Sequence, residues 1–269
     1  MQQGKGRSFS LLVAVTMVTA LGVAVEAMAA PTVSGTLLNT RVFNDDAGST
    51  LNTINNYPTQ VQFDDTTVSG AGFANLHNFH LASDFITEAV FNNGDSFDFS
   101  ADLTISGAGN GEAGLQVAPW WSHNVDGRFN VRTTDGEIAV FGGRLPFYSF
   151  TGSHGVNYTK GDTINVGVKY RANGLSAGSP GTIEYLLTLG GNDYTSGPLA
   201  YDEGNAGEGM GTWGMLDDAR VGGYVQYFTG GSGAGNGLVA NFGNLNYVPE
   251  PASLTLLAIG AVTMLRRRR

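Results

Sequence analysis

The sequence predicts an all-β protein built as an antiparallel two-sheet β-sandwich, or jelly roll. Short segments alternate apolar and polar residues, no stretch between residues 30 and 247 keeps an apolar period of 3.6, and the chain contains 40 glycines, which favour turns. Because no helix is available to cross over between parallel strands, neighbouring strands are expected to run antiparallel. About a dozen strands suit two facing sheets better than a small barrel.

The clearest strand signal lies at residues 97–105, where five apolar residues alternate with four polar ones. Residues 164–170 and 183–188 show the same alternation. The remaining predicted strands are residues 36–42, 60–63, 85–91, 113–118, 128–133, 137–141, 146–150, 221–228 and 237–247. Asp135-Gly136 is the strongest hairpin signal. Residues 191–213 form the longest stretch without a clear strand pattern and are predicted to be a loop.

The N-terminus reads as a secretory signal peptide over residues 1–29. Lys5 and Arg7 precede an apolar run at residues 9–25, and Ala27-Met28-Ala29 has the small-x-small pattern of a cleavage site. An uncleaved N-terminal anchor is the alternative, because the apolar run is a little longer than usual. Either interpretation implies export of the following chain.

The C-terminus has three consecutive parts. Val248, Pro249, Glu250 and Pro251 form a Val-Pro-Glu-Pro turn that we expect to end strand structure, because proline lacks the backbone N–H. Residues 252–265 are uncharged and mostly apolar, and as a helix they would span about 21 Å, short of a bilayer core of about 30 Å. The chain then ends in four basic residues that favour the cytoplasmic side: Arg266, Arg267, Arg268 and Arg269.

This tail resembles the PEP-CTERM sorting signal of Gram-negative bacteria. The resemblance implies that the C-terminal helix holds the protein transiently in the inner membrane until an exosortase-like processing enzyme removes it near the Pro-Glu-Pro motif. Export to the cell surface or the extracellular matrix would follow. A permanent anchor and a buried terminal helix are the alternatives. The chain therefore divides into a signal peptide (1–29), a β-sandwich domain (30–247) and a sorting signal (248–269).

Composition limits the partners of the domain. Residues 30–247 carry eight basic and 21 acidic side chains, a net charge of about −13, which argues against nucleic acid as a partner. The absence of cysteine excludes disulfides, thiol catalysis and Cys-ligated metals. No cofactor is certain. Structural calcium is one candidate, since the pairs Asp45-Asp46, Asp64-Asp65 and Asp217-Asp218 offer carboxylate oxygens, although no EF-hand spacing is present.

The region from residue 85 to residue 247 loosely resembles the concanavalin A-like lectin and glucanase superfamily. The features are the strand at 97–105, a strand entering Trp120-Trp121, the turn and strand at 161–166, and a final strand at 239–245. Glycosidases of that superfamily resemble one another in a Glu-x-Asp-x-Glu run on one strand. The nearest pattern here is Asp98-x-Ser100-x-Asp102, whose outer Cα atoms would lie roughly 13 Å apart, and a solvent-facing polar row is the favoured interpretation.

Three tryptophans are candidate carbohydrate-binding residues. If Trp120 and Trp121 lie on a regular strand they point to opposite faces, so that one is core and the other exposed; packing of both is the alternative. Trp213 lies among glycines in a predicted loop. The four histidines are scattered, and His77 and His80 would share a metal only on a helix.

No catalytic constellation is apparent, and whether the protein is an enzyme is left uncertain, with a non-enzymatic role favoured. We expect an exported, surface- or matrix-associated protein that binds extracellular polysaccharide. The alternatives are a polysaccharide-acting glycosidase of concanavalin A-like fold and a structural component of the envelope.

Overall fold

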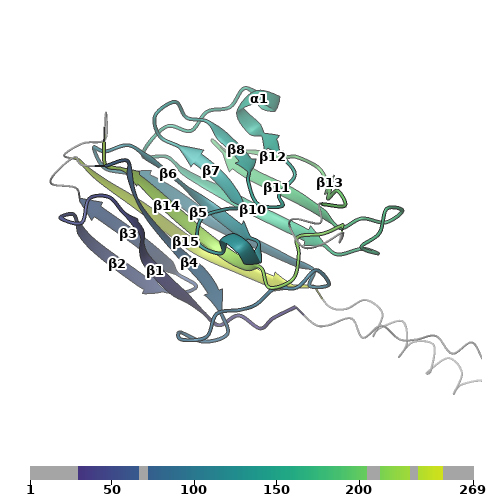
Figure 1. Ribbon diagram of the computed structural model, residues 1–269. Helices are drawn as coiled ribbons and strands as arrows, with labels where there is room; N and C mark the ends of the chain where they lie inside the picture. Colours follow the sequence, from purple (N-terminus) through teal and green to yellow (C-terminus); the bar gives the residue numbers. More distant parts are fainter. Residues whose placement is uncertain (1–29, 67–71, 205–212, 231–235, 251–269) are drawn as a thin grey trace, which may run out of the picture.

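Two antiparallel β-sheets pack face to face in the computed structural model, which describes residues 30–66, 72–204, 213–230 and 236–250 (Figure 1). The predicted all-β sandwich is confirmed. The predicted signal peptide, the apolar run at 252–265, Pro251 and the four terminal arginines lie outside the described residues. Among the residues described, no helix is long and apolar enough to cross a membrane.

One sheet has seven strands in the order β1-β4-β14-β6-β7-β8-β9. These strands are β1 (Gly35–Asn44), β4 (Ala74–Ala82), β6 (Gly111–Ala118), β7 (Arg128–Arg132), β8 (Ile138–Phe141), β9 (Tyr148–Ser149) and β14 (Arg220–Phe228).

The other sheet has eight strands in the order β12-β11-β10-β5-β15-β3-β2, with β13 paired to β11. Its strands are β2 (Thr50–Asn56), β3 (Gln60–Thr66), β5 (Phe97–Ser106), β10 (Thr163–Arg171), β11 (Thr182–Leu189), β12 (Asn192–Thr195), β13 (Leu199–Ala200) and β15 (Gly237–Pro249). Two short helices, η1 (Trp120–Ser122) and α1 (Phe150–His154), occur in the connections.

The core lies between the sheets. The alternation predicted for residues 97–105 is observed along β5, where every second residue is buried and the intervening ones are partly exposed. Apolar side chains from the facing sheet, such as Leu115 and Val225, belong to the same core cluster. Aromatic rings dominate the interior: Phe79 meets Phe242 edge-on, with ring centroids 5.1 Å apart. Such burial is the main stabilising contribution available to a chain without disulfides.

The predicted hairpin at Asp135-Gly136 is confirmed between β7 and β8. Gly136 has a φ of 75°, which glycine adopts without steric cost, and Arg132 N donates to Glu137 O across the turn.

Four strands are absent from the prediction. β4 is polar on both faces yet wholly buried, so its sequence does not alternate in the expected way. β2 is a polar strand at the edge of its sheet. β12 and β13 lie inside residues 191–213, for which the sequence predicts a loop.

The predicted strand at 85–91 is wrong. Asp84 Oδ1 accepts hydrogen bonds from the backbone N–H groups of Ile86 and Thr87, which folds the chain into a turn. Only isolated bridges form at Glu88 and Phe91. The strand predicted at 146–150 shrinks to β9, because Ser149 caps the N-terminus of α1 by accepting from Gly152 N.

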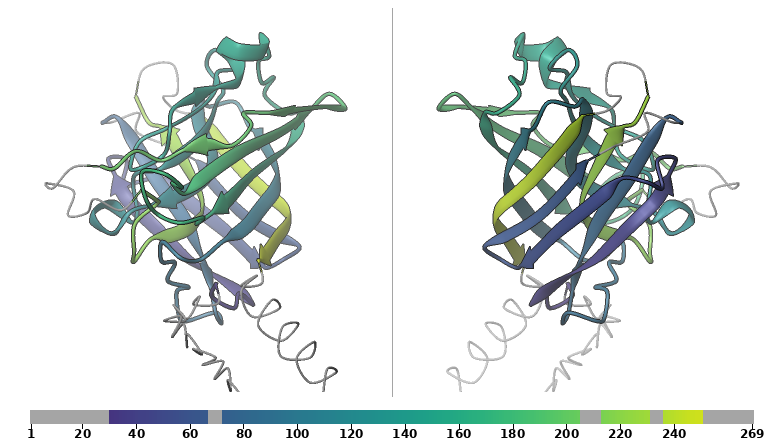
Figure 2. Two further views of the ribbon diagram at one scale, coloured as in Figure 1. Left: turned by 90° about the vertical axis from the view of Figure 1, so that its right-hand side faces the viewer. Right: turned by 90° about the vertical axis from the view of Figure 1, so that its left-hand side faces the viewer.

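The two ends of the described chain meet at one end of the sandwich (Figure 2). β15 continues to Pro249, two residues beyond the predicted strand, because its pairing with Phe97 does not need the proline N–H. The Tyr247 hydroxyl donates to Pro31 O at 2.9 Å, which joins the C-terminal strand to the start of the described chain.

We predict that the two faces of β5 contribute unequally to stability. Leu103→Ala removes a fully buried side chain and should lower the free energy of unfolding by about 2–5 kcal/mol. Thr104→Ala, on the opposite face, removes only the hydroxyl contact with Thr163 and should cost about 1 kcal/mol or less. Urea unfolding of both variants checks this; equal losses would contradict the assigned orientation.

Candidate functional site

Polar side chains cover the outer face of the seven-stranded sheet. On β4, β6, β7 and β14, the residues that alternate with core positions point away from the core. Seven of them are polar and almost completely buried: Asn78, His80, Glu112, Gln116, Asn130, Tyr224 and Gln226. We call these residues, together with Arg128, the polar face. Buried polar side chains need hydrogen-bond partners. The segment that covers this face supplies many of them.

Residues 119–127, between β6 and β7, fold back over the polar face and cover it. Four consecutive backbone carbonyls bond this segment to the face. The carbonyls of residues 123, 124, 125 and 126 accept from His80, Asn78, Arg128 and Gln116, respectively. Gly127 closes the segment with a φ of 69°, and a Cβ there would lie 1.8 Å from Val117 O. We call residues 119–127 the covering segment.

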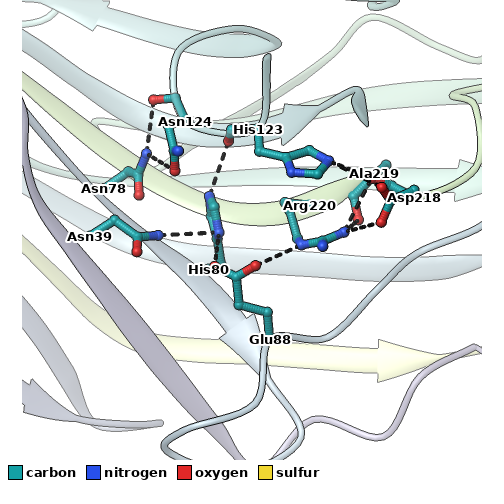
Figure 3. A network of polar contacts seen from close by, with 9 residues as sticks. All are labelled: Asn39, Asn78, His80, Glu88, His123, Asn124, Asp218, Ala219 and Arg220. Carbon is teal, nitrogen blue, oxygen red and sulfur yellow. Dashed lines mark hydrogen bonds and ion pairs between the residues drawn. The ribbon is translucent and has the colours of Figure 1, made fainter. Parts of the chain in front are cut away.

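His80 is the centre of a polar network at one margin of this face (Figure 3). Its Nδ1 lies 2.8 Å from Glu88 Oε1, and its Nε2 lies 3.1 Å from His123 O. Both ring nitrogens therefore face acceptor oxygens. Asn39 Nδ2 also approaches Nδ1, at 3.3 Å.

Glu88 joins His80 to an arginine. Glu88 Oε2 accepts from Arg220 Nε at 2.8 Å, and Arg220 in turn pairs with Asp218. The hydrogen bond from His80, with that from Arg220 and the positive charges of both, outweighs desolvation and lowers the pKa of Glu88 from 4.5 to about 2. His123 Nε2 bonds Asp218 O at 2.7 Å, which fixes the covering segment to the same cluster.

A second cluster surrounds Arg128. Its NH1 donates to Glu112 Oε1 at 2.6 Å and to Gln226 Oε1 at 2.9 Å, and its guanidinium lies 4.6 Å from the centre of the Tyr224 ring. Burial raises the pKa of Glu112, although the charge of Arg128 opposes this. The Tyr224 hydroxyl donates to Asn130 Oδ1, and burial raises its pKa well above the usual value.

Four buried polar atoms of the polar face and the covering segment have no hydrogen-bond partner among the residues described. They are Asn78 Oδ1, Gln116 Oε1, Asn130 Nδ2 and Ser122 Oγ. Gly222 pairs with Gln116, and Gly114 pairs with Asn130. Neither glycine has a side chain that could fill the space beside these atoms. Unpaired acceptors and donors at such a density are typical of a site that takes in water or a hydroxyl-bearing ligand.

Trp120 and Trp121 lie at the beginning of the covering segment, in η1 and not on a strand. Neither ring is buried: Trp120 is 45% exposed and Trp121 is partly buried, so the expected division into one core and one exposed ring does not occur. The rings meet edge-on with centroids 5.7 Å apart. Trp213 is partly buried elsewhere, where its carbonyl accepts from Gly181 N beside β11.

A shallow pocket lies beside the covering segment. Its volume is about 360 Å³, and it is lined by residues 143–147 with Ala200 and Asp202. Gly143 adjoins Pro119, because a Cβ on this glycine would lie 2.9 Å from the proline ring. Phe147 presents a ring that is 70% exposed, and Arg144 pairs with Asp202 at 2.7 Å. Sequence reasoning misses Phe147, because this residue falls within a predicted strand.

Each aspartate pair supplies a carboxylate that bonds another part of the fold. Asp45 accepts from the backbone of Phe73 and Ala74, Asp65 bonds His77, and Asp217 accepts from Asn93 N. Among the described residues, no group of three or more His, Asp or Glu is placed to hold a metal ion. Calcium binding therefore stays a prediction.

The other sequence candidates are kept apart or occupied. Three positions separate His77 from His80, so on β4 they point to opposite faces; His77 stacks on Phe63 inside the sandwich. Asp98 pairs with Arg171, and Asp102 accepts from Asn165 and Asn244, on the outer face of β5.

The Val-Pro-Glu segment is bound to the end of the sandwich. Val248 pairs with Asp98, Glu250 N donates to Ser96 O, and Glu250 Oε1 lies 2.7 Å from Arg171 NH2. Arg171 therefore bridges Asp98 of β5 and Glu250. Residues 248–269 match the PEP-CTERM protein-sorting motif.

The PEP-CTERM motif covers only the C-terminal end of the chain. It indicates export across the inner membrane, sorting to or anchoring at the cell surface, and processing by an exosortase. No curated protein is detectably similar in sequence to this chain.

Solved structures give remote likenesses. A family 7 alginate lyase, a doubly substituted A1-II′ in complex with substrate, is 9% identical over 74% of this chain and 81% of its own, with a TM-score of 0.42. Arcelin-5, a lectin-like defense protein from Phaseolus vulgaris, is 12% identical over 81% and 99%, with a TM-score of 0.36. An alginate lyase from Alteromonas sp. 272 is 12% identical over 79% and 99%, with a TM-score of 0.33. The architecture itself is defined by the strand pairing.

We predict that Glu88 contributes stability that acid removes. Because its pKa falls from 4.5 to about 2 on folding, its contribution is complete above about pH 4.5 and is lost as the pH falls toward 2. Glu88→Gln should therefore lie furthest below the wild type in free energy of unfolding near pH 7, and the gap should close in acid. Urea unfolding at several pH values measures this gap, and a constant gap would refute the assignment.

We also predict that Arg171→Ala weakens the attachment of Glu250 to the sandwich and leaves the rest of the fold unchanged. Loss of a partly exposed ion pair worth up to about 1 kcal/mol should speed hydrogen exchange at the Glu250 amide by about 2- to 5-fold. Arg132→Ala is the control, since it removes a surface arginine paired with Asp135 and Glu137. Exchange measured by mass spectrometry on the full chain should differ only for Arg171→Ala, and unchanged exchange at Glu250 would argue against the bridge.

Proposed function

We propose that this protein is an exported, surface- or matrix-associated module that binds extracellular polysaccharide without catalysing its cleavage. The observation that carries the proposal is the exposed Trp120 ring on a segment whose backbone is fixed at four consecutive carbonyls. An aromatic ring held in place stacks on the apolar face of a sugar at little cost in conformational entropy.

The surroundings of Trp120 support a carbohydrate ligand. The adjoining pocket supplies a second exposed ring, Phe147, together with the polar side chains of Arg144 and Asp202. Exposed rings with a few polar groups that fix orientation are typical of sites that bind small or repeating ligands. The PEP-CTERM motif supports export of the protein to the cell surface, with the exosortase as the processing partner.

The state of the ionisable groups favours binding over catalysis. A general acid or base must reach the reacting atoms. Both nitrogens of His80 are bonded, and the Tyr224 hydroxyl is buried and bonded to Asn130. Asp98 and Asp102, the nearest approach to a carboxylate pair along one strand, are engaged with Arg171 and with two asparagines of the neighbouring strands β10 and β15.

The test compares single substitutions in binding to polysaccharide isolated from the producing cells. Trp120→Ala and Phe147→Ala should each weaken binding by roughly 3- to 10-fold, the equivalent of about 0.7–1.4 kcal/mol for one aromatic contact. Phe73→Ala is the matched control, because this exposed phenylalanine precedes β4 at the opposite end of the sandwich.

Isothermal titration of the full-length protein gives the affinities, and urea unfolding confirms that each variant remains folded. Undiminished binding by both Trp120→Ala and Phe147→Ala would overturn the proposed site. Release of new reducing ends or unsaturated products from the polysaccharide would overturn the non-enzymatic role.

A further inference from the structure

An exposed apolar tip projects from the end of the sandwich at which the described chain begins and ends. It lies in the turn after β4, where Phe85 is 56% exposed and Ile86 is 84% exposed. Val90 and Val248, at the same end, are also exposed. Single exposed apolar residues are common on protein surfaces. Two adjacent ones on a projecting turn are a candidate contact surface.

The tip has a defined shape. Asp84 Oδ1 accepts from Ile86 N at 2.8 Å and from Thr87 N at 2.6 Å, and Ser83 N donates to Thr87 O at 3.0 Å. These bonds satisfy the backbone N–H groups of Ser83, Ile86 and Thr87 within the turn itself. Such internal satisfaction is what an apolar surface requires where water is scarce.

Both ends of the described chain reach the tip's end of the molecule. Ser34 N donates to Ala82 O, directly before the turn, and Pro31 O accepts from Tyr247. β5 begins and β15 ends on this side, where Glu250 N bonds Ser96 O. In both views of Figure 2 the turn after β4 projects at the end where β15 finishes.

The apolar run that follows Glu250 places this end of the sandwich next to the membrane. The uncharged run at residues 252–265 begins two residues later, and two residues span at most about 7 Å. The PEP-CTERM motif indicates anchoring through this segment. While the chain is anchored, the end of the sandwich that carries Phe85 and Ile86 is therefore held against the bilayer surface.

We propose that the Phe85–Ile86 tip docks into the interfacial region of the membrane to which the unprocessed chain is attached. The partner is a lipid surface, contacted by the apolar side chains at the headgroup boundary. The Asp84 carboxylate flanks the pair, and residues 30–247 carry a net charge of about −13, so a zwitterionic surface fits better than an anionic one. The tip thus sets the orientation of the sandwich on the membrane, in addition to the tether.

The experiment uses the full chain reconstituted in phosphatidylcholine vesicles whose acyl chains carry bromine, a contact quencher of tryptophan. Phe85→Trp places the reporter in the tip, and Phe73→Trp places it at a similarly exposed phenylalanine at the opposite end. Emission of the wild type, which contains Trp120, Trp121 and Trp213, is subtracted from both. We expect most of the added Phe85→Trp emission to be quenched and shifted to shorter wavelength, and the added Phe73→Trp emission to be unaffected.

Ile86→Trp repeats the measurement at the neighbouring position in case Phe85→Trp does not fold. Replacing about one third of the headgroups with anionic lipid should reduce the quenching, because the Asp84 carboxylate and the net negative charge of the domain are repelled by a negative surface. Absence of quenching at both tip positions would overturn the proposal. Quenching of Phe73→Trp to the same extent would also overturn it, because the sandwich would then have no fixed orientation. A short-wavelength, unquenched tip signal that depends on protein concentration would overturn it in favour of a second copy of the chain as the occupant.

Discussion

Hydrogen bonding between the covering segment and the polar face is the constraint on which the functional surface depends. The outer side chains of β4, β6, β7 and β14 are too polar to join a core and too buried to be solvated. Four consecutive carbonyls of one segment supply part of the required hydrogen bonding, because each accepts from a different side chain of the sheet. These bonds also fix the backbone of the segment. Trp120, which precedes those carbonyls, is therefore attached to a rigid part of the chain.

The sandwich was predictable where a single face of a strand is apolar. β5 alternates residue by residue, and its pairing with β10 and β15 follows from burying that face. β4 escaped prediction because Asn75 and His77 lie on its inner face and Asn78 and His80 on its outer face, so that neither face is uniformly apolar. Their burial depends on partners outside the strand, such as Asp65 for His77 and the carbonyl of His123 for His80.

The same reasoning explains why the candidate site was only partly predicted. Trp120 could be chosen from the sequence because adjacent tryptophans are conspicuous, but its exposure follows from η1, which begins immediately after Pro119. The strand expected at residues 85–91 had suitable apolar residues, yet the side chain of Asp84 competed for the backbone N–H groups that a strand would have used. Local side-chain hydrogen bonds of this kind leave little trace in hydrophobic periodicity.

The sorting motif and the sandwich are structurally continuous, and this continuity relates anchoring to binding. Pro249 is still part of β15, and Arg171 connects Glu250 with Asp98 of the neighbouring strand. The covering segment follows β6, whose last residue, Ala118, pairs with Arg220 near this same end. An anchored chain would therefore hold Trp120 close to the membrane, where a bulky extracellular polymer has restricted access. Removal of the C-terminal segment would free that end, so that under the proposed function the position of β15 links processing to access to the proposed binding surface.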